Sequence, residues 1–399
     1  MSQKNFTTKL LGMEGAKIKE FTETETEIRI GIEMNLKKHT CPECGKRTKA
    51  IHDYRICRIT DLSVRGKHLR LEYRKRRYRC AGCGKRFAER CSFVGKYQRF
   101  TYRVAQKIIE LLHTRLSAKD IARETGTSGS GVHRCLKLVN RGRPSRLPTV
   151  LALDEFKGNA GGERFQCILT APAEKRVLDI LPDRTVSTIQ SYLKGFPNRD
   201  EVEYVIMDMN RGYRDIAQSF FPTAKIVIDR FHVVRYVTKA PDDVRRRIQK
   251  HLLPETRKYF KRSRRLLLIH ESKLKPEERI ALNRMLAFSE DLSKAYALKE
   301  AFYTMMEAKS SEAASLLLKK WLDVDFILKI PEFKPCSRML RNWKPYILNM
   351  FDVPYSNGFT EGCNNSVKTL KRIAFGFRNF HHFRARILLA ASPSPQHLT

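Results

Sequence analysis

The sequence has few acidic residues for its length and no long apolar run. Lysine and arginine number 78 against 42 aspartates and glutamates, which leaves a formal net charge of +36 over 399 residues. No apolar stretch approaches the roughly 18 residues that a membrane-spanning helix needs. The first residues also lack the apolar centre of a secretory signal peptide. We therefore expect neither a membrane-spanning nor an exported protein.

The surplus of positive charge predicts a polyanionic partner, and nucleic acid is the first expectation. An anionic membrane surface is the weaker interpretation, because no segment pairs a polybasic face with a free apolar one. The length predicts about two or three domains, with enough material for a sizeable core. Low-complexity tracts are absent, and the only repetition is a pair of cysteine motifs.

Cysteines are used in a way that predicts metal binding in a reducing compartment rather than disulfides. Four of the ten form two Cys-x-x-Cys pairs, and a glycine after each pair permits the tight turn that points both sulfurs at one ion. Four thiolates suit a structural, tetrahedral Zn²⁺. The predicted zinc ligands are Cys41, Cys44, Cys80 and Cys83. Four reduced structural cysteines are the alternative, and Cys57 and Cys91 are expected to be ordinary thiols.

Residues 101–139 have the apolar spacing of three short helices. Ser117 begins the second helix with a capping pattern, and Gly126 marks a tight turn before the third. This succession is typical of a helix-turn-helix, in which the third segment reads the major groove. The predicted DNA-contacting residues are Ser130, His133, Arg134 and Lys137. A generic three-helix bundle is the alternative.

Residues 150–230 alternate short apolar runs with helical patterns, which predicts an α/β (α+β) fold with a mixed sheet. Strands are expected at 150–154, 165–171, 176–181, 204–208 and 225–229, with helices near 186–196 and 213–220. Beyond residue 233 the strand patterns disappear until about residue 350. We therefore expect an all-helical insertion there.

Two of the expected strands end in an acidic residue, Asp154 and Asp208, and Glu361 follows far downstream. Buried strands that deliver carboxylates to one edge of a sheet can hold divalent metal. Phosphodiester cleavage needs an activated nucleophile, neutralised phosphate charge and a stabilised leaving oxygen, which two Mg²⁺ or Mn²⁺ ions supply. Carboxylate oxygens suit these hard cations. The three acids therefore predict a metal-dependent DNA-cutting site.

Glu361 belongs to a segment whose helical spacing separates a polar from an apolar face. The polar face, predicted to bind metal and phosphate, holds Glu361, Asn365, Lys368 and Arg372. The opposite, packing face holds Val367, Leu370 and Ala374. The alternative is a solvated helix on which Glu361 only pairs with Lys368.

Asp229 also ends an apolar strand, so composition alone leaves open whether Asp208 or Asp229 is the second metal ligand. We prefer Asp208, because a polar loop with a glycine follows it and admits substrate. Asp229 and His232 would then support the ligands from behind. A histidine beside a core phenylalanine is more often structural, which is the alternative for His232.

Cysteine pairs, helix-turn-helix and acids, in this order, resemble the ISL3 family of bacterial insertion-sequence transposases. The resemblance runs from about Cys41 to Leu389, and four motifs carry it, beginning at Leu153, Met207, Asp229 and Asn357. It implies an RNase H-like core, Mg²⁺-dependent cleavage and joining of double-stranded DNA at transposon ends, and binding of the terminal repeats by the N-terminal modules. A homo-oligomeric synaptic complex and a cytoplasmic, nucleoid-associated location follow by the same analogy.

The family pattern assigns catalysis to Asp154, Asp208 and Glu361, and a supporting role to Asp229 and His232. The predicted domains are a zinc ribbon at 1–98, a helix-turn-helix at 99–140, a catalytic domain at 148–232 and 351–390, and the helical insertion at 233–350. A basic hinge from Asn140 is the expected main boundary. The polar ending after Ala391 departs from the family, and a truncated final helix would weaken activity.

Two other functions fit the sequence. An inactive or domesticated relative would act as a sequence-specific DNA-binding protein through its zinc ribbon and helix-turn-helix. A structure-selective nuclease with the same core would cut branched or hybrid substrates without a preference for end sequences.

Overall fold

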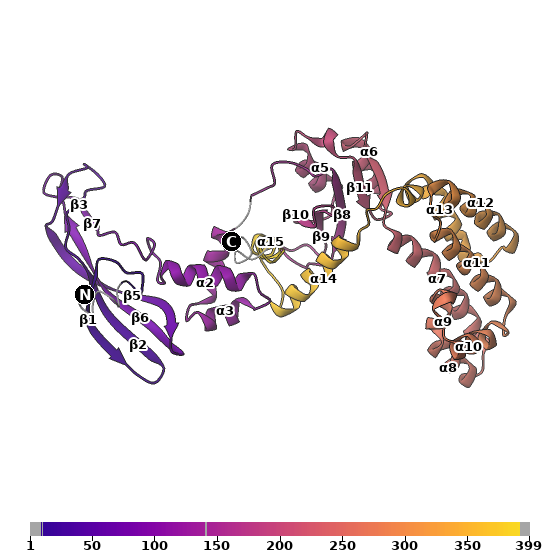
Figure 1. Ribbon diagram of the computed structural model, residues 1–399, viewed down its shortest axis with the longest axis horizontal. Helices are drawn as coiled ribbons and strands as arrows, with labels where there is room; N and C mark the ends of the chain where they lie inside the picture. Colours follow the sequence, from indigo (N-terminus) through magenta and orange to yellow (C-terminus); the bar gives the residue numbers. More distant parts are fainter. Residues whose placement is uncertain (1–8, 10, 140–141, 392–399) are drawn as a thin grey trace. The chain divides into compact units, whose positions relative to one another are not determined.

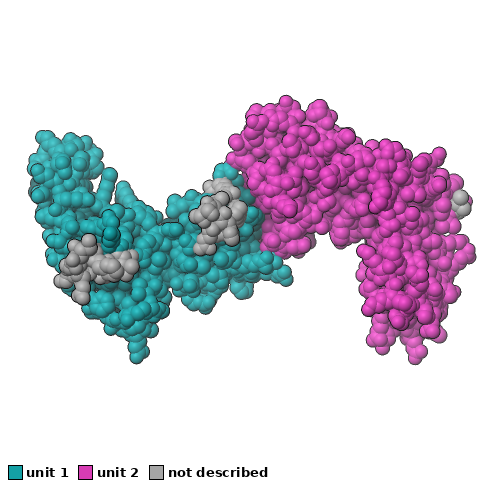
Figure 2. All heavy atoms as spheres, in the orientation of Figure 1, with its two compact units in different colours: residues 1–142, 369–399 teal, residues 143–368 magenta. Residues whose placement is uncertain are grey.

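The computed structural model describes Lys9, residues 11–139 and residues 142–391. The predicted polar tail after Ala391 and the first two residues of the predicted hinge lie outside the described residues. The chain divides into two compact units, residues 1–142 with 369–399 and residues 143–368 (Figure 2). Within the described residues, no helix has the length and apolar character that crossing a membrane requires.

The first unit begins with a five-stranded sheet (Figure 1). Its strands are β1 (Ala16–Glu23), β2 (Glu27–Met34), β5 (Ile51–Val64), β6 (Lys67–Arg79) and β7 (Arg86–Ala88). They follow the order β1-β2-β6-β5, and β7 pairs with β6. Alternate residues of β2 and β6, such as Ile30 and Leu71, face a common core. Two further short strands, β3 (His39–Thr40) and β4 (Arg47–Thr48), form a separate hairpin whose loop holds the first two cysteines.

Three short helices follow, as the sequence predicts: α2 (Tyr102–Leu112), α3 (Ala118–Glu124) and α4 (Gly129–Leu138). Each helix begins at a residue whose side-chain hydroxyl oxygen accepts a hydrogen bond from a backbone nitrogen of the first turn. These residues are Thr101 for α2, Ser117 for α3 and Ser128 for α4. Their buried apolar residues form one core, to which Val104, Ile121 and Val132 contribute.

A fourth helix, α15 (Phe380–Ala390), completes this core, because Ala385 and Leu389 pack into it. The buried guanidinium of Arg386 donates hydrogen bonds to the backbone oxygens of Leu112, Thr114 and Leu116, where α2 ends and the turn to α3 begins. The sequence predicts a catalytic domain that includes residues 351–390, whereas the compact unit that holds the helix-turn-helix includes residues 369–399. The difference arises from these long-range contacts, which local patterns do not reveal.

The second unit contains a five-stranded sheet in the order β10-β9-β8-β11-β12 (Figure 1). Its strands are β8 (Val150–Phe156), β9 (Gln166–Ala171), β10 (Arg176–Leu181), β11 (Tyr204–Met207) and β12 (Lys225–Ile228). The first three pair antiparallel, and β8, β11 and β12 run parallel. Helices α5 (Val186–Lys194) and α6 (Arg211–Phe220) and the short η1 (Arg199–Glu201) connect them. The predicted mixed α/β fold, RNase H-like in the catalytic part, is confirmed.

Strand β8 extends beyond the run that the sequence analysis delimited. We expected it to end at Asp154, but it continues to Phe156, since Asp154 and Phe156 pair with Ile168 and Gln166 on β9. Asp154 therefore projects from within a strand, where pairing with Ile168 on β9 restrains its backbone. Asp208 and Asp229, in contrast, directly follow the last residues of β11 and β12.

The described residues from 233 to 350 form helices joined by turns, without a strand, as predicted. They are α7 (Arg230–Ile248), α8 (Pro254–Arg262), α9 (Arg264–Leu268), α10 (Pro276–Leu286), α11 (Glu290–Met306), α12 (Ser311–Leu328) and α13 (Lys334–Leu348), with short 3-10 turns η2 (Gln249–His251), η3 (Glu271–Lys273), η4 (Pro331–Phe333) and η5 (Asn349–Phe351). Phe302, Trp321 and Phe333 are fully or almost fully buried among them. After the insertion, α14 (Gly358–Ile373) carries Glu361 back to the sheet.

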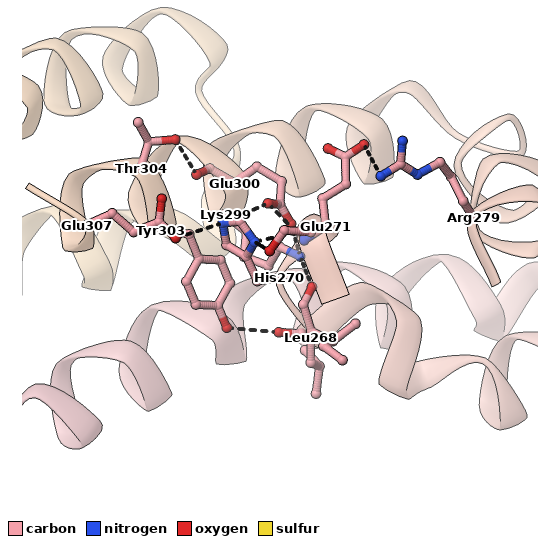
Figure 3. A network of polar contacts seen from close by, with 11 residues as sticks. Leu268, His270, Glu271, Arg279, Lys299, Glu300, Tyr303, Thr304 and Glu307 are labelled. Atoms are coloured by element: carbon pink, nitrogen blue, oxygen red, sulfur yellow. Dashed lines mark hydrogen bonds and ion pairs between the residues drawn. The ribbon is translucent and has the colours of Figure 1, made fainter. Parts of the chain in front are cut away.

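One polar network in the insertion surrounds a lysine that solvent does not reach (Figure 3). Lys299 Nζ donates to the backbone oxygen of Ile269 at 2.7 Å and pairs with the carboxylate of Glu300. The hydroxyl of Tyr303 donates to the backbone oxygen of Leu268 at 3.0 Å. Burial lowers the pKa of Lys299. The network ties α11 to the carbonyls that end α9, which no helix hydrogen bond satisfies.

Candidate acidic active site and DNA-binding modules

Asp154 is buried in the candidate site, with 5% of its surface exposed. Its Oδ1 accepts a hydrogen bond from the backbone nitrogen of Glu155 at 2.7 Å. Its Oδ2 accepts from the side-chain amides of Asn364 at 2.9 Å and Asn357 at 3.2 Å. Burial, and then the charge of Asp208, raise the pKa of Asp154 to about 6. The two amides fix the orientation of this carboxylate, which ionises less readily than an ordinary aspartate.

Asp208 and Asp229 lie side by side because β11 and β12 are parallel neighbours and each acid follows its strand. His232, in the first turn of α7, places Nδ1 at 2.9 Å from Asp208 Oδ1 and 2.8 Å from Asp229 Oδ2. Hydrogen bonds to Asp208 and Asp229 raise the pKa of His232 to about 10. Asp229 also begins α7, since its Oδ1 accepts from the backbone nitrogen of Phe231 at 3.2 Å.

Glu361 lies in the first turn of α14 and joins the same group of charges. Burial raises its pKa, followed by the charge of Asp229; His232 opposes the increase, and Asp208 adds to it. Asp208 is thus the charge that acts most on Asp154, whereas Asp229 acts most on Glu361. The structure brings both aspartates to the site, and the choice of Asp208 as the second metal ligand stays a prediction.

The faces of α14 differ from the predicted faces at one position, because Asn364 lies on the buried face. Asn365 and Lys368 are exposed and pair with each other at 3.4 Å, and Arg372 is also exposed. The buried face holds Thr360, Asn364, Val367 and Leu370. Sequence reasoning selected Asn365 and missed Asn364, the residue that holds Asp154.

A signal for the missed residues exists in the sequence. Asn357, Asn364 and the buried Val367 recur at spacings of seven and three, the period of one helix face. Thr360 lies on the same face, and its hydroxyl meets that of Thr170 on β9 at 2.8 Å. Buried polar residues in this pattern indicate a helix that packs on a sheet edge and holds a polar group there.

The acids fit a divalent cation. Ligand atoms of Asp208, Asp229 and His232 lie within 4.8 Å of one another. Asp208 Oδ1 is buried, and His232 Nδ1 approaches it at 2.9 Å. Carboxylates that are buried close together repel each other unless a cation joins them. Carboxylate ligands in this number favour a hard cation such as Mg²⁺ or Mn²⁺.

The four predicted zinc ligands converge in the first unit. Cys41 and Cys83 place their Sγ atoms 3.6 Å apart, those of Cys44 and Cys80 lie 3.5 Å apart, and all four fall within 4.8 Å. Gly45 and Gly84 adopt φ values of 73° and 70°, which lets each loop turn tightly behind its cysteine pair. This arrangement suits a structural Zn²⁺ with four thiolate ligands.

Three of the four residues predicted to contact DNA are exposed on α4: Ser130, Arg134 and Lys137. The fourth, His133, is half-buried, because its ring stacks on that of His382 from α15 at 4.7 Å. Burial lowers the pKa of His133. His133 as a DNA contact stays a prediction, and part of its ring is covered by His382. Helix α15, which covers it, was not expected in this unit.

Comparisons with known proteins agree with the order of these parts. A family described as transposase matches residues 151–387, more than half of the chain. The chain belongs to the ISL3 family of DDE transposases. Two further families match: the zinc-finger of the transposases of IS204, IS1001, IS1096 and IS1165 at residues 37–83, and the helix-turn-helix domain of transposase family ISL3 at residues 89–139.

Several relatives of this ISL3 transposase are described individually. The transposase for insertion sequence element IS1001 from Bordetella parapertussis is 27% identical over 378 residues, 91% of each chain. The transposase for IS1557 from Mycobacterium tuberculosis is 25% identical over 202 residues, 45% of each chain. A protein described as an ATP-dependent protease from Lactococcus lactis is 40% identical over 63 residues, only 16% of this chain. That short match carries no functional argument.

Proposed function

We propose that this ISL3 transposase binds the terminal inverted repeats of its insertion sequence and catalyses Mg²⁺- or Mn²⁺-dependent cleavage and strand transfer there. The observation that carries the proposal is the grouping of Asp154, Asp208 and Glu361, with Asp229 beside them, at one edge of the sheet. Acids this close to one another repel unless a cation joins them. Their grouping in a basic protein therefore supports chemistry on phosphates.

The ligands proposed for the cations are Asp154, Asp208 and Glu361. When bound, the cations would activate the attacking oxygen and neutralise charge on the phosphate and the leaving oxygen. Asn357 and Asn364 orient Asp154 by their hydrogen bonds. Asp229 and His232 hold Asp208 in place from behind, as supporting residues do in metal sites.

The helix-turn-helix brings DNA binding, and we propose the exposed residues Ser130, Arg134 and Lys137 as contacts in the major groove. Lys368 and Arg372 are proposed phosphate contacts, being exposed cations on the helix of Glu361. Two transposon ends have to meet during transposition, so a homo-oligomeric synaptic complex is part of the proposal. A cytoplasmic, nucleoid-associated location accords with a DNA substrate.

The experiment incubates the purified full chain with DNA that carries the ends of its own element, in Mg²⁺ or Mn²⁺. Wild type is expected to nick and join this DNA, and Asp154→Asn to lose activity by at least 100-fold, a typical consequence of losing a group that stabilises the transition state. Asp323→Asn is the matched control, an exposed aspartate on α12. Equal activity of wild type and Asp154→Asn would show the assignment to be wrong. Specific end binding without cleavage in either metal would select the non-catalytic DNA-binding protein.

A further inference from the structure

A groove in the second unit opens beside the acids and continues along the helical insertion. Its volume is about 1020 Å³, and Asp208 and His232 lie in its wall. The rest of the wall comes from Glu155 on β8, from Met209 and Asn210 in the loop before α6, and from α6, α7, α9 and α13. The metal ligands proposed above use only the end of this space. Most of it belongs to the insertion, whose role the acids do not explain.

One face of α7 forms a continuous track along the groove. His232, Arg235, Lys239 and Arg246 line it at spacings of three, four and seven residues, so they share one side of the helix. At 1.5 Å of rise per residue, the track from His232 to Arg246 is about 21 Å long. It therefore leads from the candidate active site outward, with cationic side chains along its length.

Two exposed cations of the groove wall, Arg235 and Arg338, are available to a ligand. Among the described residues, no carboxylate lies within ion-pair distance of Arg235 on α7 or Arg338 on α13, and both are exposed. Asp242, the acid in the middle of the wall, is buried and already faces Arg246 at 3.2 Å and Arg264 at 3.0 Å. The wall thus retains a surplus of positive charge that a chain of phosphates can neutralise.

An aromatic side chain lies between the cations. Tyr236 lines the groove next to Arg235 and is 42% exposed, although a tyrosine usually gains by burying its ring. A positive track with an accessible aromatic ring is the arrangement that binds single-stranded nucleic acid, because bases stack on the ring and phosphates follow the cations. In a duplex, the faces of the bases are covered by their neighbours, so Tyr236 could not stack on them.

We propose that this groove binds a short single-stranded segment of the DNA strand that leaves the acidic site. Arg235 and Arg338 contact its phosphates, and Tyr236 stacks on a base. The groove volume, at the top of the roughly 300–1,000 Å³ range of ligand pockets, holds a few nucleotides of one strand. The inference rests on the proposed function in taking the DNA to be the one that is cut. The insertion would thereby position the scissile phosphate at the acids.

The test measures binding of an oligodeoxythymidine of about ten nucleotides, within the usual site size, to the full chain as a function of salt. Each phosphate contact to a single strand adds about 0.7 to the slope of log affinity against log salt. Arg235→Ala with Arg338→Ala is therefore expected to lower the slope by about 1.4. The control pair is Lys319→Ala with Lys320→Ala, two exposed lysines on α12 outside the groove. This pair removes the same charge and is expected to leave the slope unchanged.

Tyr236 is tested separately. Tyr236→Ala is expected to weaken oligodeoxythymidine binding about tenfold, and Tyr236→Phe to restore it, because stacking needs the ring and not the hydroxyl. With 5-iodouracil in the oligonucleotide, light is expected to crosslink the probe to a peptide that contains Tyr236. Melting temperatures close to that of wild type would show that the variants fold.

Three results would overturn the inference. One is an equal loss of slope in the groove pair and the α12 pair; another is crosslinking only to peptides of the first unit; the third is normal binding by the groove variants. Failure of the proposed function would look different: wild type would cut no DNA in any divalent metal, while the groove variants would still lose oligodeoxythymidine binding. If the groove variants bind normally and Asp154→Asn alone loses cleavage, the groove inference fails and the proposed function stands.

Discussion

Replacing Asn364 by leucine should move the pH dependence of cleavage, because this amide holds a buried carboxylate in its charged form. Asn364 donates to Asp154 Oδ2 at 2.9 Å, and the pKa of Asp154 is already raised to about 6 by burial. A hydrogen bond to a charged group contributes about 1.5–3 kcal/mol. One pKa unit corresponds to about 1.4 kcal/mol, so losing the bond should raise the pKa by about one to two units.

The sign follows from the form that binds metal. Only the ionised carboxylate is a ligand, so the acid limb of the profile reports the pKa of Asp154. In Asn364→Leu, cleavage at neutral pH should fall about two- to tenfold and recover as the pH rises towards 9, since most Asp154 then ionises again. Leucine has the same branched arrangement of side-chain heavy atoms as asparagine but lacks its donor.

The assay measures initial cleavage rates at one subsaturating concentration of Mg²⁺. The pH runs from about 5.5 to 9, a range that spans the pKa of Asp154 in wild type and in the variant. Asn365→Leu is the matched control, because this neighbouring asparagine is exposed and its side-chain oxygen accepts from Lys368. An unchanged profile in Asn364→Leu, or an equal shift in Asn365→Leu, would refute the reasoning.

Three further changes probe other parts of the chain. Cys44→Ser should release zinc and impair DNA binding, whereas Cys57→Ser should not; unchanged zinc by elemental analysis would contradict this. Arg386→Ala should destabilise the first unit by about 3–5 kcal/mol, measured by chemical denaturation, since it leaves three carbonyls without a donor. Lys299→Ala should cost the second unit a similar amount, about 3–5 kcal/mol, because Glu300 loses its buried partner, and Lys294→Ala, partly exposed on the same helix, should cost less than about 1 kcal/mol.

The sequence predicted those features that a local pattern determines. Four thiolates in two tight turns required only short spacings, and Asp208 and Asp229 were found because each follows a buried parallel strand. The two strands are neighbours, so both acids reach the site and the preference for one of them had no geometric basis in the sequence.

Other features depend on contacts between distant segments. Arg386 bonds to Leu112, 274 residues earlier, and this contact determines that α15 belongs with the helix-turn-helix and covers His133. Asn364 and Asn365 are indistinguishable by type, and only the exact rotation of α14 against the sheet decides which one meets Asp154. Hydrophobic periodicity gives a helix face to within about one residue, which is too coarse for that choice.

The most direct test of the account is metal rescue at the acids. Wild type is expected to cleave its own element ends in Mg²⁺, whereas Asp154→Cys and Asp208→Cys should be inactive in Mg²⁺ and regain cleavage with a softer divalent cation that accepts thiolate. Asp229→Cys is expected to show no such rescue, because Asp229 supports Asp208 through His232. Wild-type cleavage without any divalent cation, or full activity of Asp154→Cys in Mg²⁺, would contradict the proposal that these acids hold the metal.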